Sequence, residues 1–265
     1  MLKKVFSFLL PAIVLCPQLS MAQELPTRTL TITENDSVYA YVQPPSKNLD
    51  GRLIAIPVTF IAYGAASLKL GDLKKLNTHM NNEIFLESRH KPLHFDNYLQ
   101  YAPAVMVYGL NLAGVKGKNN FIDRTMIYGI SNAILGATVM TTKHFTREWR
   151  PDGSNQMSFP SGHTATAFAA AEFMRREYQD RSVWYGVAGY AMAATTGYMR
   201  MYNNRHWFGD VVAGAGVGIL STDLAYFLYP KMKRIFTGSK DNGATVVTPT
   251  YQDGAVGLSL VHMFK

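Results

Sequence analysis

Cysteine is almost absent from this chain of 265 residues, and the one cysteine present, Cys16, lies in the first segment. That segment begins with two lysines, continues as an apolar stretch at 5–15 and ends in a Ser-Met-Ala pattern before Gln23, which is typical of a cleaved export signal. We therefore expect residues 1–22 to be a signal peptide and the mature chain to contain no thiol. The lack of thiols excludes disulfide bonds, thiolate catalysis and metal sites with cysteine ligands.

Charged residues are scarce as well, at 17% of the sequence compared with about 25% in an average soluble domain. The mean hydropathy of −0.03 nevertheless falls short of that of a typical lipid-embedded helix bundle. Lys and Arg outnumber Asp and Glu by 26 to 18, and removal of the two signal-peptide lysines leaves a mature net charge of +6 (24 minus 18). This charge favours an anionic partner. Because the basic residues are scattered and form no run interleaved with aromatic residues, we expect no nucleic-acid partner.

Changes in composition divide the mature chain into three parts. Residues 23–52 are polar, with a short alternating stretch and two adjacent prolines, which predicts an extended N-terminal arm. Residues 53–235 are rich in small apolar residues that let helices approach closely, and we expect a helical domain there. Residues 236–265 form a C-terminal tail whose sequence alternates with period two past Gly243, around the turn at Asp253 and Gly254, which predicts a small β-hairpin. The alternative for this tail is an outer-membrane insertion signal.

The helical domain is expected to contain six helices. Five are marked by uncharged stretches and the other by an Ala-rich stretch. The uncharged stretches are 53–68, 97–115, 125–142, 182–199 and 211–222, and the Ala-rich stretch begins near Ser161.

The sequence leaves open whether these helices cross a membrane. The uncharged stretches lie at the lower limit for a span of about 20 apolar residues. If each were to cross, Lys and Arg would be divided equally, with ten on each side, so no positive-inside bias is present. We therefore expect an exported helical domain that is soluble or membrane-associated, with a polytopic arrangement as the alternative.

Three clusters of polar residues lie at the edges of expected helices, and the first contains Lys143, Arg150 and Pro151. Two cations separated by six residues after a helix can hold one anion between them. The guanidinium of Arg150 forms a planar fork that suits phosphate oxygens, and the ammonium of Lys143 is a point charge on a flexible stem. The alternative for this cluster alone is an ordinary solvated basic loop.

The second cluster is the tetrapeptide Pro160, Ser161, Gly162 and His163, which precedes an Ala-rich stretch. Ser161 is placed to cap the helix that follows. The backbone N–H groups of Ser161 and Gly162 at that helix start would form an anion site, with His163 beside the anion in a position to transfer a proton. The alternative is simple helix capping.

The third cluster contains Arg200, His206 and Asp210. If a helix begins near His206, the imidazole and the Asp210 carboxylate lie on one helix face, four residues apart. The carboxylate can then accept from one imidazole N–H and leave the other nitrogen nucleophilic. The alternative is an ordinary pair of residues on a helix surface.

Taken in order, the three clusters read Lys-x6-Arg-Pro, Pro-Ser-Gly-His and Arg-x5-His-x3-Asp, and ten specified residues between positions 143 and 210 match. This set resembles the type 2 phosphatidic acid phosphatase superfamily and the related bacterial acid phosphatases. The resemblance implies an all-α fold, a six-helix bundle of the phosphatidic acid phosphatase/haloperoxidase type, to which the N-terminal arm and C-terminal hairpin are additions. One position departs from the family pattern, because Met199 stands where a serine usually precedes Arg200, and this puts fine substrate preference in doubt.

The resemblance implies a phosphatase that needs no metal and no cofactor and forms a phosphohistidine. His206 would attack phosphorus, Asp210 would orient His206, and His163 would protonate the leaving oxygen. The phosphate oxygens would be held by the remaining motif residues, which are Lys143, Arg150, Arg200 and the N–H groups of Ser161 and Gly162.

We expect the substrate to be a phosphate monoester or diphosphate on an envelope lipid, such as phosphatidic acid, lipid A or a polyprenyl diphosphate, more than a small soluble phosphoester. The location implied by the signal is the bacterial periplasm or the cell-envelope membrane. Aromatic residues near the motifs have two interpretations, contact with lipid or packing in the core; they are Trp149, Trp184, Tyr202 and Trp207. Two other functions stay open: a vanadate-dependent haloperoxidase, and a non-catalytic envelope protein that binds anionic lipid.

Overall fold

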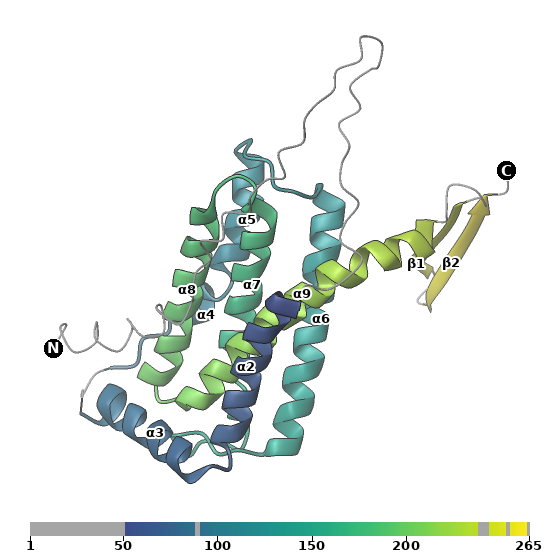
Figure 1. Ribbon diagram of the computed structural model, residues 1–265. Coiled ribbons are helices and arrows are strands. Elements are labelled where there is room, and N and C mark those ends of the chain that lie inside the picture. Colours follow the sequence, from purple (N-terminus) through teal and green to yellow (C-terminus); the bar gives the residue numbers. More distant parts are fainter. Residues whose placement is uncertain (1–50, 88–90, 238–243, 253–254, 264–265) are drawn as a thin grey trace. The chain divides into compact units, whose positions relative to one another are not determined.

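The structure is a computed structural model, and it describes residues 51–87, 91–237, 244–252 and 255–263 of the chain. The signal peptide expected at 1–22, nearly all of the arm expected at 23–52 and the hairpin turn at Asp253 and Gly254 lie outside the described residues. The part at 51–237 is helical (Figure 1).

Eight α-helices and one turn of π-helix follow one another in this helical part. They are α2 (Gly51–Ser67), α3 (Gly71–Asn81), η1 (Asn82–Leu86), α4 (Asp96–Leu99), α5 (Ala102–Leu112), α6 (Phe121–Thr146), α7 (Gly162–Tyr178), α8 (Val183–Tyr202) and α9 (Phe208–Thr237). Two strands come after it, β1 (Ala244–Gln252) and β2 (Ala255–Met263), and they pair antiparallel with Gln252 opposite Ala255.

Six helices was too low a count. Each of the six expected stretches lies on a helix, but α3 and η1 have charged and polar sequences that a search for uncharged stretches passes over. The stretch at 97–115 is divided between α4 and α5, because Pro103 lies in the first turn of α5 and a proline of this kind starts a helix more readily than it continues one.

α7 is the central helix of the described part. It packs against α8, α9 and α5, and its alanines at 165, 167, 169, 170 and 171 are fully buried. Small side chains let the neighbouring helix axes come close, so that close backbone packing takes the place of interlocking large side chains.

Two glycines of α9 set the distance between α9 and α7. A Cβ atom at Gly214 would lie 2.6 Å from the carbonyl oxygen of Ser161, and one at Gly218 would lie 2.2 Å from the carbonyl oxygen of Ala165. Both positions therefore exclude any side chain. Because Ser161 belongs to the second motif and α9 begins beside the third, this close contact holds two motifs at one end of the bundle.

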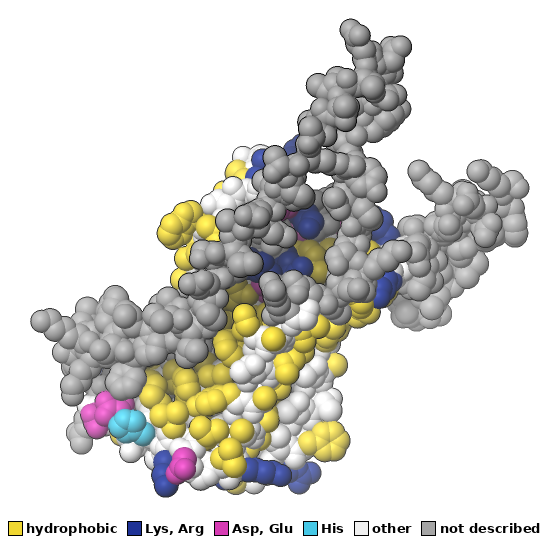
Figure 2. Space-filling model, viewed as in Figure 1, with side chains coloured by type: hydrophobic (Ala, Val, Ile, Leu, Met, Phe, Trp, Pro, Cys, Tyr) yellow, Lys and Arg dark blue, Asp and Glu magenta, His cyan; other side chains and the backbone are white. Residues whose placement is uncertain are grey.

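The outer surface of the helices carries many exposed apolar side chains. On the face seen in Figure 2, apolar side chains gather over α2 and the helices beside it, and Ile56 and Val58 of α2 are both 46% exposed. Among the described residues, Phe208–Lys233 is long and apolar enough to cross a membrane, and 67% of its most apolar window is buried; a second candidate is the bent pair Ile54–Ser67 and Gly71–Leu86. The apolar surface supports membrane association.

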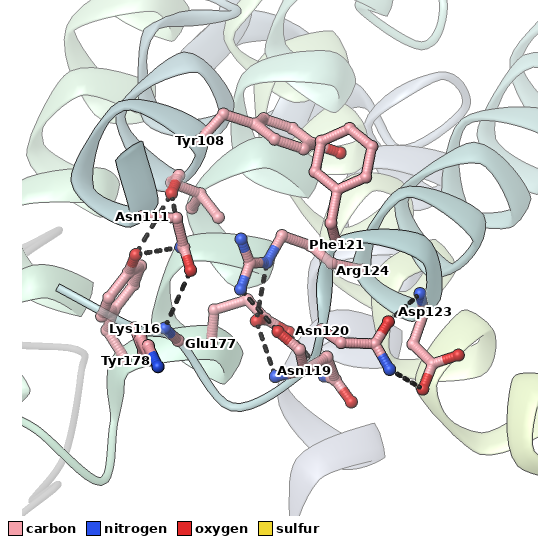
Figure 3. Close-up of polar contacts among 12 residues, drawn as sticks. Tyr108, Asn111, Lys116, Asn119, Asn120, Phe121, Asp123, Arg124, Glu177 and Tyr178 are labelled. Atoms are coloured by element: carbon pink, nitrogen blue, oxygen red, sulfur yellow. Dashed lines mark hydrogen bonds and ion pairs between the residues drawn. The ribbon is translucent and has the colours of Figure 1, made fainter. Parts of the chain in front are cut away.

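The far end of α7 is closed by a buried polar network (Figure 3). Arg124 of α6 donates to Glu177 of α7 at 3.1 Å, and the Tyr178 hydroxyl donates to the carbonyl oxygen of Val115 at 3.0 Å. A pocket of about 560 Å³ lies at this end, between residues that include Tyr108 and Lys116. The 17 residues of α7 place about 25 Å between this pocket and the second motif, so none of the expected site residues lines it.

Replacement of Gly218 by alanine tests the close packing of α9 on α7. The added Cβ atom meets backbone and not a flexible side chain, so we expect Gly218→Ala to lower the free energy of unfolding by about 1–3 kcal/mol. The control is Gly136→Ala on α6, where a Cβ atom meets nothing within 4 Å and alanine favours the helix. Thermal unfolding followed by circular dichroism measures both, and equal stability of the two variants would contradict the packing argument.

Candidate active site

The three motifs meet at one end of the bundle, where four helices begin or end. Lys143 lies in the last turn of α6, His163 in the first turn of α7 and Arg200 in the last turn of α8. His206 lies two residues before the start of α9, and Asp210 lies in the first turn of that helix. The structure thus brings together residues that are separated by as many as 67 positions in the sequence.

Hydrogen bonds join the motifs directly. The Ser161 N–H donates to the backbone carbonyl of Asp210 at 3.0 Å, which links the second motif to the third. The Trp207 indole N–H donates to the carbonyl of Trp149 at 2.8 Å, which links the third motif to the loop that carries Arg150. These bonds fix the helix ends relative to one another.

His206 and Asp210 lie side by side in the interior. The Nδ1 atom of His206 is 3.5 Å from Oδ2 of Asp210, and both side chains are 2% exposed. The same Oδ2 atom accepts from the Ser158 hydroxyl at 2.5 Å and from the Trp207 N–H at 2.9 Å. The carboxylate is therefore held in place by two donors while it faces the imidazole. Ser158 belongs to no motif, and no signal in the sequence identified it.

The cations of the site are buried to different degrees. Lys143 is 8% exposed, and its ammonium donates to the carbonyls of Met157 and Ser158 at 2.5 and 3.1 Å. Burial lowers the pKa of Lys143 from 10.5 to about 8. Arg150 lies in the loop between α6 and α7, three residues after Arg147, which caps the end of α6 in the left-handed conformation with φ 47°.

Unpartnered polar atoms concentrate at this site. Within the described residues, four buried side-chain polar atoms lack a hydrogen-bond partner, and three of them are Nε of Arg150, Nε of Arg200 and Nδ1 of His206. Nδ1 of His206 faces Oδ2 of Asp210. The two guanidinium nitrogens have no such neighbour, and because buried donors without acceptors are costly, they indicate a missing acceptor. In the same part of the chain, no group of three or more His, Cys, Asp or Glu side chains could hold a metal ion. The donor set suits an oxyanion.

Ser161 differs from the expectation in one respect. Its hydroxyl accepts from the N–H of Thr164 at 3.4 Å and so caps α7 as expected. Its own N–H, however, is engaged by the carbonyl of Asp210, because the start of α9 lies against this turn. The Ser161 N–H therefore does not face a phosphate in this structure. The Gly162 N–H, in the first turn of α7, stays the predicted phosphate donor.

Two residues outside the motifs contact the site from α4. Asp96, which is fully buried, accepts from Nη1 of Arg200 at 2.6 Å, and Oδ1 of Asn97 lies 2.9 Å from Nε2 of His163. The sequence analysis missed both residues. In the sequence, Asp96 is a single acidic residue in a short polar stretch that precedes an apolar stretch. Nothing in that pattern indicates a contact with Arg200, which is 104 positions away.

The electrostatic environment favours neutral histidines in the free site. Burial, and then the positive charges of Arg200, Arg150 and Lys143, lower the pKa of His163 from 6.5 to about 4. Burial and the same three cations hold the pKa of His206 well below 6.5. Burial raises the pKa of Asp210 from 3.8 to about 6, although its bonds to Ser158 and Trp207 act in the opposite direction. A neutral His206 retains the lone pair that a nucleophile needs.

Large apolar side chains are exposed near the motifs. Tyr98 beside Asn97 is 82% exposed, Phe145 in the last turn of α6 is 79% exposed, and Trp149 beside Arg150 is 54% exposed. Trp207 is half-buried. Trp184 is also exposed, but it lies in the first turn of α8, at the opposite end of that helix from Arg200, so the expectation that it lies near the site was wrong. An exposed apolar rim next to a cationic site suits an amphiphilic ligand with an anionic head.

Comparison with known protein families finds one matching family model. A model described as the PAP2 superfamily matches residues 124–234, which contain all three motifs. The lipid A 1-phosphatase of Porphyromonas gingivalis is 41% identical over 144 residues, which cover 54% of this chain and 32% of that protein. The lipid A 4′-phosphatase of Bacteroides thetaiotaomicron is 36% identical over 74 residues, or 28% of this chain and 32% of that protein. The chain thus spans about a third of the length of these curated relatives.

Two solved structures match parts of this chain. The crystal structure of Aquifex aeolicus LpxE gives a TM-score of 0.45 at 22% identity, and the match covers 57% of this chain and 94% of that one. The transmembrane PAP2 type phosphatidylglycerolphosphate phosphatase of Bacillus subtilis gives a TM-score of 0.46 at 17% identity, over 69% of this chain and 98% of that one.

Sulfate binding tests the electrostatics of the site, because sulfate stays a dianion throughout the neutral range. At pH about 6, His163 is neutral in the free protein since its pKa is about 4, and Lys143 is already protonated since its pKa is about 8. A bound dianion raises the pKa of His163, so we expect sulfate binding to take up protons. Asp210 contributes to the same uptake.

Titration calorimetry in two buffers of different ionisation enthalpy measures this proton uptake. The His163→Asn variant should still bind sulfate through the cations but take up fewer protons than the parent. Equal uptake by the parent and the variant, or none by the parent, would contradict the assignment of His163 to the anion site.

Proposed function

This chain belongs to the PAP2 superfamily, and on that premise we propose that it is a lipid phosphatase that hydrolyses a phosphate monoester or diphosphate through a phosphohistidine. The family match confirms the resemblance that the three motifs carry. The curated relatives are phosphatases of lipid A by name. For this chain the activity, the substrate and the roles of the residues are our proposals.

The observation that carries the proposal is the set of unpartnered donors around a neutral buried histidine. Nε of Arg150 and Nε of Arg200 lack acceptors, and a phosphate supplies them. Three cations around one phosphate stabilise the charge that develops on its equatorial oxygens, which is the main task in phosphoryl transfer. A non-catalytic binding protein would have no need of the His206 and Asp210 pair beside this phosphate.

The first chemical step forms a covalent intermediate. The free lone pair on Nε2 of His206 attacks phosphorus while Nδ1–H turns towards Oδ2 of Asp210, 3.5 Å away. The bond between phosphorus and the leaving oxygen breaks, and that oxygen takes a proton from His163. His163 carries this proton because the bound phosphate dianion raises its pKa above that of the free site.

The second step returns the site to its starting state. A water molecule gives a proton to His163 and adds its oxygen to phosphorus as the bond to Nε2 of His206 breaks. Inorganic phosphate then leaves, and every proton and bond is restored. Asp210 stabilises the positively charged imidazole in both steps, and Ser158 and Trp207 keep the carboxylate aimed at it.

A membrane lipid is the substrate class that the surface supports best. The exposed apolar rim at Tyr98, Phe145 and Trp149 lies next to the motif residues, where the acyl part of a lipid would lie while its phosphate enters the site. The signal pattern at 1–22 adds export to the periplasmic side of the envelope. Among envelope lipids, we propose lipid A first, because a curated relative that is 41% identical over 144 residues is a lipid A 1-phosphatase by name.

His206→Ala tests the proposed mechanism most simply. The variant lacks the nucleophile, so we expect phosphate release to fall by at least about 10⁴-fold and no phosphoenzyme to be trapped. Phosphate release from lipid A, phosphatidic acid, undecaprenyl diphosphate and nitrophenyl phosphate measures turnover, and a radiolabelled phosphate group reports the intermediate.

The matched control is His79→Ala, which removes an exposed histidine on α3 and should leave all rates unchanged. A phosphoenzyme that persists in His206→Ala would move the nucleophile to another residue. Halide oxidation with peroxide and vanadate, without phosphate release from any substrate, would replace the proposed function by that of a haloperoxidase.

A further inference from the structure

The short helix α4 contacts two motif residues and belongs to no motif. We propose that its Asp96 and Asn97 are positioning residues of the phosphatase reaction: Asp96 turns one edge of the Arg200 guanidinium towards the phosphate, and Asn97 decides which nitrogen of His163 exchanges the proton. The inference rests on the proposed function. It explains how the orientation of the Arg200 guanidinium and the tautomer of His163 are set.

The Asp96–Arg200 pair leaves one edge of the guanidinium free. Nη1 of Arg200 donates to Oδ2 of Asp96 at 2.6 Å, and the two side chains are 8% and 0% exposed. Nε of Arg200 is buried and has no partner. With Nη1 occupied, the edge formed by Nε and Nη2 is the one that can grip two phosphate oxygens side-on, as a planar fork does. Asp96 therefore determines which edge of the Arg200 guanidinium faces the phosphate and fixes the plane of that group.

α4 is itself anchored to the end of α8. Asn203, directly after α8, donates to the carbonyl of Leu93 at 2.6 Å and accepts from the N–H of Leu93 at 2.9 Å. The same amide group reaches Oδ1 of Asp96 at 3.4 Å. Arg200 and the carboxylate that orients it are thus fixed to the same helix end. A residue can hold another in one orientation only if it is itself held in place, and these bonds hold Asp96 in place beside Arg200.

Asn97 fixes the tautomer of His163. Its Oδ1 atom lies 2.9 Å from Nε2, and an amide oxygen only accepts, so Nε2 carries a proton. In the neutral ring Nδ1 is then the free lone pair, and Nδ1 is the atom that gains a proton and passes it to the leaving oxygen. The charged and titratable groups that act on His163 from the surrounding elements are Asp96, Lys143, Arg150, Arg200 and His206.

A double-mutant cycle tests the role of Asp96. Asp96→Asn keeps the shape but loses the charge that holds the guanidinium, and we expect kcat to fall by about 10- to 100-fold with little change in KM. In an Arg200→Ala background the same change should lower kcat by less than about threefold, since its only route of action is gone. The same factor in both backgrounds would reduce Asp96 to a merely structural residue. Asp72→Asn, an exposed acid on α3, is the control.

The pH profile of kcat tests the role of Asn97, because a purely structural defect does not shift this profile. Asn97→Asp keeps the acceptor and adds a negative charge beside the imidazole, so the protonated form of His163 persists to higher pH. We expect the alkaline limb of the profile to move up by about one pH unit. Asn120→Asp makes the same charge change near the far end of α7 and keeps a helix cap, so it should leave the limb in place. An unmoved limb in Asn97→Asp overturns the assignment.

The two levels of the account fail in different ways. If the parent chain releases phosphate from none of the four substrates, the proposed function fails. If the parent turns over while Asp96→Asn acts equally in both backgrounds and Asn97→Asp leaves the profile unmoved, only the positioning role of α4 is lost.

Discussion

An excess of buried positive charge at the ends of α6 and α8 is the constraint on which the rest of the site depends. Lys143 and Arg200 are each less than one-tenth exposed, and Arg150 retains a buried nitrogen without an acceptor. Asp96 faces Arg200 and Asp210 faces the neutral His206, so neither of these two carboxylates forms an ion pair with Lys143 or Arg150. An anion with two negative charges balances this excess positive charge, and the phosphate group of the substrate is such an anion. The same excess charge keeps both histidines neutral until the anion arrives.

Helix packing keeps these charges together against their repulsion. Gly214 and Gly218 let α9 approach α7 at backbone distance, and the bond from the Ser161 N–H to the carbonyl of Asp210 joins the starts of the two helices. Because of that bond, the Ser161 N–H cannot donate to the phosphate, and it aligns the second and third motifs instead. A free energy cost at the site is thereby offset by contacts along the bundle, which is how proteins maintain strained or charged functional sites.

The sequence predicted which motif residues meet in the fold better than it predicted the contacts between them, and their roles in catalysis stay predictions. Lys143, Arg150, His163, Arg200, His206 and Asp210 all meet at one end of the bundle, because motif spacing reflects helix ends that chemistry requires. Ser158, Asp96 and Asn97 could not be predicted, since each acts through a tertiary contact with a partner at least 52 positions away. The helix α3 was missed for a different reason: its apolar residues are few and its amphipathic face is short.

The central claim is that Nε2 of His206 is bonded to phosphorus while the three cations hold the equatorial oxygens. A crystal structure of the protein with vanadate, which imitates the five-coordinate phosphorus, tests it most directly. The account predicts a bond from vanadium to Nε2 of His206, with vanadate oxygens on Lys143, Arg150 and the Nε edge of Arg200. Vanadate bound away from His206, or held through its oxygens alone with His206 turned aside, would contradict the account.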